Sequence, residues 1–267
     1  MNRTSKKLTW FGHNCFLFEH GSTRFLTDPF FVKGLAPVAP EKVDADYLLV
    51  SHAHGDHCAD ATTVARRSNG TIIGVAEVAD FYGRKGARVE PINIGGAIYL
   101  PCAGTGNSAL AQVLATPAPH SSTFSDGTSG GNSLGFVLSF SQNGLGLGSQ
   151  APEIKPLQES LADADAFSIY FACDAGYFSE MEAIGRLKID VAVLPIGDRY
   201  TMGPSLSLDA INAIKPRFVV PAHYDTWAPI AQDARKWSEA VVKYTQATPL
   251  VLKVGESVQE DADGTWK

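Results

Sequence analysis

Hydrophobic and polar positions alternate with a period of about 2 in some segments, as in strands, and of about 3.6 in others, as in helices. The resulting order is strands first and then strands alternating with helices. Short apolar and β-branched runs separated by turn residues predict strands at 7–11, 15–19, 24–27, 71–75, 88–94, 97–100, 110–116, 134–140, 167–172, 190–196, 217–221 and 249–254. Helical spacing predicts helices at 60–67, 76–85, 177–187, 206–214 and 230–244. This order is typical of an α/β fold.

Turn residues suggest how neighbouring strands connect. The first three strands are expected to form an antiparallel meander, and the Gly95-Gly96 pair is expected to join the strands at 88–94 and 97–100 as a hairpin. Periodicity is lost over residues 141–165, which we interpret as a surface insertion or lid.

The length of 267 residues fits one large layered structure, so we expect a single domain over residues 1–267. The formal net charge is -6 and no long basic run occurs, which argues against a nucleic-acid partner and favours a small-molecule substrate. A polar start and the lack of a long apolar run predict a cytoplasmic protein without membrane insertion. The four cysteines are scattered, which predicts reduced thiols. Homo-oligomer formation stays open.

A histidine-rich hexapeptide, residues 52–57 (His-Ala-His-Gly-Asp-His), follows the apolar run at 47–50 and is the strongest chemical signal in the chain. In an extended loop, side chains two positions apart point the same way, so His52 and His54 can converge on one metal ion. Asp56 and His57 can then turn towards a second. Imidazole and carboxylate donors suit zinc, manganese or iron.

Three further ligand-type residues, His120, Asp174 and His223, each follow a predicted strand. Strand ends on one edge of a sheet face the same crevice, so residues far apart in sequence can meet there. A single histidine in such a place is more often an ordinary residue, but the joint pattern with residues 52–57 favours one metal centre.

These residues, in this order, resemble the metallo-β-lactamase superfamily, and the resemblance covers nearly the whole chain. It implies a four-layer αββα sandwich, two mixed sheets flanked by helices. It also implies that His52, His54 and His120 hold a first metal, that Asp56, His57 and His223 hold a second, and that Asp174 bridges the two. Asp28 matches an acidic residue that, in this superfamily, orients the ligands of the metal-binding segment corresponding to residues 52–57.

More narrowly, the stretches 12–14 (Gly-His-Asn), 28–30 (Asp-Pro-Phe), 195–198 (Pro-Ile-Gly-Asp) and 200–204 (Tyr-Thr-Met-Gly-Pro) resemble uncharacterised metal-dependent hydrolases related to L-ascorbate-6-phosphate lactonase. Two features depart from that branch. Residues 173–175 read Cys-Asp-Ala where Gly-Asp-Thr is more usual, and residues 141–165 are longer than the usual hairpin.

The roles of some residues near the expected site stay open. His13 could bind a substrate anion or donate a proton to the leaving group, or it could only cap the first hairpin. Asp198 could orient a ligand or be a turn residue. The apolar residues Phe30, Phe31 and Leu35 could line a substrate cleft or fold back on the core.

The resulting prediction is a metal-dependent hydrolase in which hydroxide generated at two divalent ions cleaves a small lactone, ester or phosphodiester. Zinc is the first choice of metal, with manganese or iron as alternatives, and catalytic roles fall on Asp56, Asp174 and His13. One alternative is a phosphodiesterase acting on a lipid or cyclic nucleotide. An alternative from another class is a non-catalytic metal-binding or sensor protein that keeps the fold.

Overall fold

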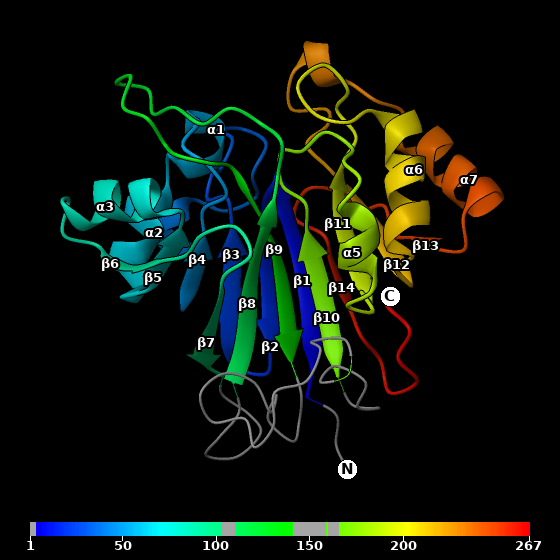
Figure 1. The fold of residues 1–267 in the computed structure, drawn as a ribbon, viewed down its shortest axis with the longest axis horizontal. Coiled ribbons are helices and arrows are strands. Elements are labelled where there is room, and N and C mark those ends of the chain that lie inside the picture. Colours follow the sequence, from blue (N-terminus) through cyan, green and yellow to red (C-terminus); the bar gives the residue numbers. More distant parts are fainter. Residues whose placement is uncertain (1–3, 103–109, 141–158, 160–165) are drawn as a thin grey trace.

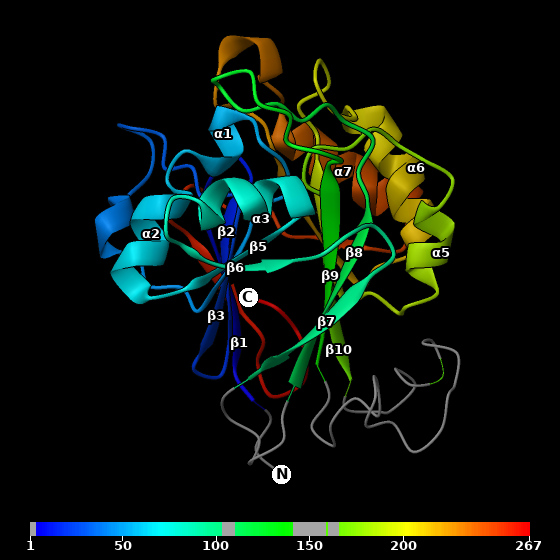
Figure 2. The same ribbon diagram turned by 60° about the vertical axis from the view of Figure 1, so that its left-hand side comes forward.

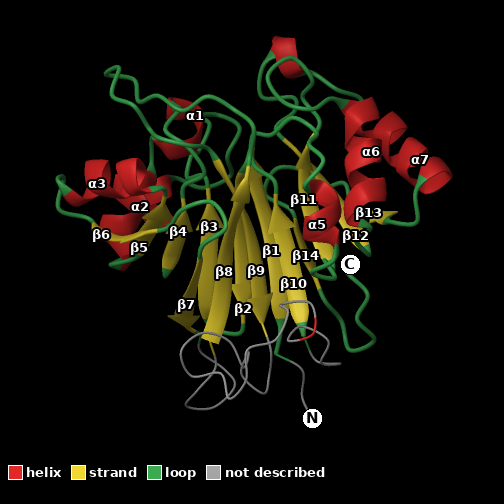
Figure 3. Cartoon of the chain, in the orientation of Figure 1, coloured by secondary structure: helices red, strands yellow, loops and turns green. Residues whose placement is uncertain are grey.

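Two seven-stranded sheets packed face to face form the centre of the protein (Figure 1). A computed structural model describes residues 4–102, 110–140, 159 and 166–267. Residues 141–165, predicted to be an insertion or lid, lie outside the described residues except for Glu159. Helices flank the paired sheets on both sides (Figure 3), which confirms the predicted αββα sandwich.

The first sheet has the strand order β14-β1-β2-β3-β4-β5-β6. Its strands are β1 (Lys6–Gly12), β2 (Cys15–His20), β3 (Thr23–Thr27), β4 (Tyr47–Leu49), β5 (Thr71–Gly74), β6 (Arg88–Pro91) and β14 (Ser257–Gln259). Strands β1, β2 and β3 pair antiparallel, which confirms the predicted meander, and β3 to β6 run parallel.

The second sheet has the order β13-β12-β11-β10-β9-β8-β7. Its strands are β7 (Ala97–Pro101), β8 (Leu110–Pro117), β9 (Leu134–Phe140), β10 (Phe167–Phe171), β11 (Val191–Pro195), β12 (Phe218–Ala222) and β13 (Thr248–Pro249). Every residue of β10, β11 and β12 is buried, as expected of parallel strands covered on both faces.

Helices cover the outer face of each sheet. On the first sheet lie α2 (Ala61–Ser68) and α3 (Ala76–Gly83), with a 3-10 turn η1 (Pro40–Lys42) beside α2, whereas α1 (Gly55–Cys58) lies at one end of the sandwich (Figure 1). On the second lie α5 (Met181–Gly185), α6 (Pro204–Ile214) and α7 (Ala234–Tyr244), with η3 (Ala228–Ile230) before α7 (Figure 2).

Aromatic side chains from both inner faces form the core between the sheets. Phe18 of β2 stacks on Phe167 of β10 with ring centroids 5.7 Å apart, and it also contacts Phe140 of β9. Phe16 of β2 packs against Phe171 of β10 with tilted rings, their centroids 6.4 Å apart. Each such ring buries a large apolar area and prefers offset or tilted packing, so these pairs fix how the sheets face each other.

Three predicted elements are wrong. The strands at 88–94 and 97–100 form no hairpin, because β6 pairs with β5 in the first sheet and β7 with β8 in the second. The last strand was expected at 249–254, but β13 ends at Pro249 and β14 pairs with β1. Helix α7 begins at Ala234 rather than at 230, because Asp233 accepts hydrogen bonds from the backbone N–H groups of the first turn.

Two further local predictions were also inaccurate. The helix expected at 177–187 shortens to α5, five residues from Met181 to Gly185. The hexapeptide at 52–57 is extended only at its start, since Gly55 already begins α1. The side chains of Asp56 and His57 therefore project from a helical turn, and they join a different donor group from His52 and His54.

Candidate metal centre

The seven predicted ligands gather at one end of the sandwich, the end where α1 lies (Figure 1). His52 and His54 lie between β4 and α1, and Asp56 and His57 lie in α1. The other three, His120, Asp174 and His223, follow β8, β10 and β12, which run in the same direction and so deliver their ends to the same edge. The structure thus brings together residues from four separate stretches.

His52, His54 and His120 form a three-histidine group. One ring nitrogen from each lies within 4.8 Å of the others. Nε2 of His52 is 3.0 Å from Nδ1 of His54, and the His120 ring centroid lies 5.0 Å and 5.2 Å from theirs. Ring nitrogens that converge in this way can share one metal ion.

A second set, the mixed group, consists of His13, Asp56, His57 and His223. Its donor atoms also lie within 4.8 Å of one another. Three of these residues are the predicted second set of ligands. The fourth residue, His13, whose role the sequence left open, is fully buried inside this group.

Asp174 lies between the two groups and contacts both. Its Oδ2 is 3.5 Å from Nε2 of His120 on one side. On the other side it is 3.3 Å from Nε2 of His57 and 3.1 Å from Nε2 of His223. Oδ1 accepts a hydrogen bond of 2.7 Å from Nδ2 of Asn14, which fixes the carboxylate in this position. The placement fits a carboxylate shared by two ions.

Asp28 is fully buried and is linked to both groups by hydrogen bonds, to His57 directly and to His52 through Ser51. Its carboxylate accepts hydrogen bonds of 2.8 Å from the backbone N and Oγ of Ser51 and from Nδ1 of His57. Because Ser51 Oγ donates to Asp28, Nδ1 of His52 donates to Ser51 Oγ, 2.9 Å away. Both histidines thus carry a proton on Nδ1 and turn Nε2 towards the cluster, where a metal ion could take the place of a proton.

Burial and close charges shift the pKa values of the cluster. Burial acts to lower the pKa of His57, but Asp174 and Asp28 prevail and raise it well above its usual value. Burial acts to raise the pKa of Asp174, but His57 and His223 hold it well below its usual range. For His52 and His13 burial dominates, so the pKa of His52 falls well below normal and that of His13 falls to about 4. Such opposed shifts are typical of functional sites.

Asp56 follows the same pattern as Asp174. Burial acts to raise the pKa of its carboxyl, but the neighbouring His13 and His57 rings lower it below its usual value. It is therefore ionised at neutral pH and available as an oxygen donor.

Orphaned nitrogens show that a metal ion fits this cluster. Nε2 of His13 and Nε2 of His57 are buried at the cluster, and within the described structure they have no hydrogen-bond partner of good geometry. A buried polar atom without a partner costs roughly 1–3 kcal/mol. A divalent cation held by imidazole and carboxylate donors would satisfy such atoms and offset the negative charge of Asp56 and Asp174.

Strained backbone is concentrated at this site. His13, Asp28, Cys173 and His223 have φ values of 53°, 37°, 52° and 52°. Non-glycine residues in this region cost of order 1–3 kcal/mol each and persist where surrounding contacts hold them. The sequence pattern gives no sign of this strain, apart from the position of each residue at the end of a strand.

Other predicted site residues lie outside the cluster. Asp198 is exposed, has a φ of 70° and sits in a turn where Thr201 N donates to its carbonyl oxygen. Phe31 packs on Phe11 in the core, with centroids 5.3 Å apart, whereas Leu35 is exposed. Phe30 remains half-buried beside the His13 ring.

Sequence reasoning missed the roles of Asn14, Thr226 and Trp227. Asn14 positions Asp174, Thr226 Oγ1 lies 2.9 Å from Nδ1 of His13, and Trp227 packs against the His13 ring. Asn14 was noted only as part of a short motif. Thr226 and Trp227 follow His223 by three and four positions, a spacing that carries no known chemistry by itself.

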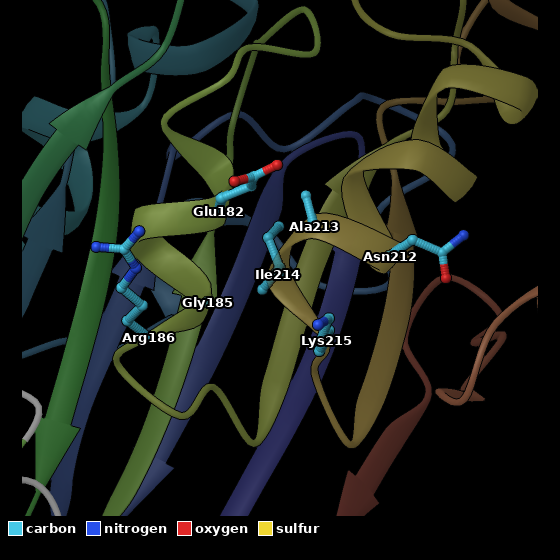
Figure 4. Close-up of a pocket in the computed structure, with 7 residues that line it drawn as sticks. All are labelled: Glu182, Gly185, Arg186, Asn212, Ala213, Ile214 and Lys215. Atoms are coloured by element: carbon cyan, nitrogen blue, oxygen red, sulfur yellow. The ribbon is translucent and has the colours of Figure 1, made fainter.

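A cavity of about 390 Å³ lies elsewhere, between α5 and the end of α6. Figure 4 shows its lining, which includes Glu182, Arg186 and Lys215 and none of the predicted ligands. Within the described residues, the helices are all too short or too polar to cross a bilayer.

Gly197 provides a test of the His223 position. A Cβ at residue 197 would collide with the carbonyl oxygen of His223 and approach its ring. We expect Gly197→Ala to cost about 1–3 kcal/mol of stability, as overpacking usually does, and to weaken metal binding roughly tenfold. Gly176→Ala is the matched control, because a Cβ there meets nothing within 4 Å. Thermal unfolding and metal titration measure both effects, and equal behaviour of the two variants would contradict this role for Gly197.

The class of the protein follows from a comparison with known families. Residues 7–147 and 161–223 match the model of the beta-lactamase superfamily domain, and the chain belongs to that superfamily. Within it, the chain is 38% identical over 259 residues to a protein of Pelotomaculum thermopropionicum named UPF0173 metal-dependent hydrolase, covering 95% of this chain and 99% of that one. A protein of the same name from Thermus thermophilus is 34% identical over 256 residues, covering 96% and 99%.

A solved structure agrees with this placement. Igni18, described as a metallo hydrolase from the archaeon Ignicoccus hospitalis, superposes with a TM-score of 0.77 at 30% identity and covers 97% of this chain and 99% of its own. The predicted superfamily and fold are confirmed. The narrower relation to L-ascorbate-6-phosphate lactonase stays a prediction.

Proposed function

We propose that this protein is a metal-dependent hydrolase that cleaves a small lactone, ester or phosphodiester with the help of two divalent ions. The observation that carries the proposal is the position of Asp174 between the three-histidine group and the mixed group. The names of its relatives support hydrolysis with metal dependence.

Two bound ions would lower the pKa of a shared water towards about 7 and polarise the group under attack. The residues of this chain then have separate tasks. Asp28 and Ser51 hold His52 and His57 in the tautomer that can bind metal. Asn14 holds Asp174 in position. His52, His57, Asp174 and His223 are buried away from bulk water, which strengthens the electrostatic contacts among them.

Zinc is the first choice of metal by donor chemistry, with manganese or iron as alternatives. Histidine nitrogens and carboxylate oxygens suit all three ions, and no cysteine belongs to either donor group among the described residues.

The aromatic pair Phe30 and Trp227 favours the second candidate, phosphodiester cleavage of a lipid or cyclic nucleotide. Their ring centroids lie 6.2 Å apart and both rings pack against His13. Trp227 is 42% exposed, so it can contact an apolar group of a substrate next to the cluster.

Metal removal followed by an activity panel tests the proposal. We expect protein purified without chelator to hydrolyse at least one member of a lactone, ester and phosphodiester panel. Stripping the metal should abolish that activity and lower the melting temperature, since an ion present at 1,000 times its Kd stabilises by about 4 kcal/mol. Restoring the metal should restore both.

The remaining outcomes distinguish the alternatives. Hydrolysis of phosphodiesters alone would select the phosphodiesterase. Tight metal binding with no hydrolysis of any of the three classes would favour the non-catalytic metal-binding or sensor protein, and would contradict the proposed activity.

A further inference from the structure

The His13 side chain lies among the donors of the mixed group. It is fully buried, and its ring centroid lies 4.0 Å from that of His223 and 5.1 Å from that of His57. Its Nε2 is 3.4 Å from Oδ2 of Asp56. A residue that donates protons to a leaving group needs access to substrate, whereas a metal ligand needs only the ion.

The backbone ties His13 directly to His223. The backbone N–H of His223 donates to the carbonyl oxygen of His13 at 3.1 Å, and Nε1 of Trp10 donates to the same oxygen at 3.0 Å. Both histidines have φ values just above 50°. Their rings therefore reach the cluster as one locked pair, although the residues are 210 positions apart in the sequence.

The His13 ring also has a fixed direction. Thr226 Oγ1 holds Nδ1 at 2.9 Å, while Trp227 and Phe30 pack against the ring with centroids 5.0 Å and 5.9 Å away. These contacts leave Nε2 facing Asp56 and His57, buried and without a hydrogen-bond partner in the described structure. A hydrogen-bonded Nδ1 and a free, inward-facing Nε2 are the arrangement of a metal-binding histidine.

We propose that His13 is a ligand of the second metal ion, which rests on the proposed two-metal function and adds an eighth ligand to the seven expected. The second position then has five protein donors, namely His13, Asp56, His57, His223 and Asp174. The first has four, namely His52, His54, His120 and the shared Asp174. The two positions are therefore chemically unequal.

His13→Gln tests this proposal by metal binding rather than by activity. The chelator-stripped protein is titrated with Zn²⁺ and, separately, with Mn²⁺, and the bound metal is quantified after desalting. We expect two equivalents for the wild type. For His13→Gln we expect one equivalent at nearly wild-type affinity and a second weakened by roughly 100-fold, since even partners of ligands cost 10–100-fold.

His20→Gln is the matched control. His20 is also buried, but it lies at the opposite end of β2 from the cluster, stacked on Phe140 with centroids 4.2 Å apart. The His20→Gln variant should have a lower melting temperature than the wild type but should still bind two equivalents of metal. If His13→Gln binds two equivalents of either ion as tightly as the wild type does, His13 is not a ligand.

Thr226 is a positioning residue in this scheme and gives a second test. Thr226→Val removes the partner of Nδ1 and should weaken the second binding step roughly tenfold, while Thr226→Ser keeps the hydroxyl and should restore it. If His13→Gln does not fold, as judged by its melting curve, this pair decides the question, and equal metal binding by Val and Ser variants would overturn the proposal.

The proposal and the proposed function fail in different ways. Wild-type protein that binds fewer than two ions and hydrolyses nothing contradicts the function. Wild-type protein that binds two ions and hydrolyses substrate, together with an unaffected His13→Gln variant, contradicts the ligand role of His13 alone.

Discussion

Replacing Asp174 with alanine should remove the shared carboxylate and with it both metal occupancy and turnover. Asp174 is nearly fully buried and contacts histidines from both donor groups. Loss of several kcal/mol of transition-state stabilisation corresponds to roughly 10³-fold or more in rate. Metal quantitation should show fewer than two ions per chain, and kcat/KM should fall by that factor.

Two further variants define what Asp174 contributes. Asp174→Asn keeps the shape and can still accept the hydrogen bond from Asn14, but it lacks the negative charge. It should lose activity almost as fully as Asp174→Ala while melting closer to the wild type. Asp80→Ala, which changes an exposed carboxylate on α3, should alter neither property. Wild-type metal content in Asp174→Ala would refute the shared-ligand role.

Replacing Asp28 should produce the second largest effect, although Asp28 is fully buried and contacts the cluster only through Ser51 and His57. Asp28→Ala leaves the backbone N–H of Ser51 and Nδ1 of His57 without acceptors in a fully buried place. Breaking a buried charged pair of this kind costs about 3–5 kcal/mol. We expect a lower melting temperature together with metal affinity reduced by roughly 10–100-fold.

Asp28→Asn separates stability from tautomer control. If the amide oxygen accepts from Ser51 N, the NH₂ group faces Nδ1 of His57 and forces that nitrogen to accept. The His57 proton then moves to Nε2, where it blocks the metal. Asp28→Asn should therefore keep most of the stability and still lose the second ion. Intact binding of two ions by Asp28→Asn would show that the tautomer of His57 does not matter.

The sequence was sufficient to predict most of the side chains that gather at the candidate site, because its signals are local. Four ligand-type residues fall within positions 52–57, and His120, Asp174 and His223 each follow a recognisable strand. Parallel strands deliver their ends to one edge, so this placement could be inferred without coordinates.

Long-range pairing could not be predicted in the same way. The strands β6 and β7 are separated by only a few residues, yet they enter different sheets. The Gly95-Gly96 pair indicates a turn, but it does not indicate which strand pairs with β6 or with β7. That choice depends on tertiary contacts. The pairing of β14 with β1, at opposite ends of the chain, is beyond any local pattern for the same reason.

The position of His13 shows a similar limit within the site. A single histidine between two strands has no spacing relation to residues 52–57, so its chemistry stayed ambiguous. Its inward direction comes from the hydrogen bond to Thr226 and from the backbone bond to His223, both more than 200 positions away.

The three-histidine group and the mixed group should each hold an ion, with Asp174 between the two ions. The most direct measurement is an anomalous-scattering map from crystals grown with manganese or zinc. We expect two peaks roughly 3.5–4 Å apart, one beside His52, His54 and His120 and one beside Asp56, His57 and His223. A single peak, or peaks away from Asp174, would contradict this arrangement.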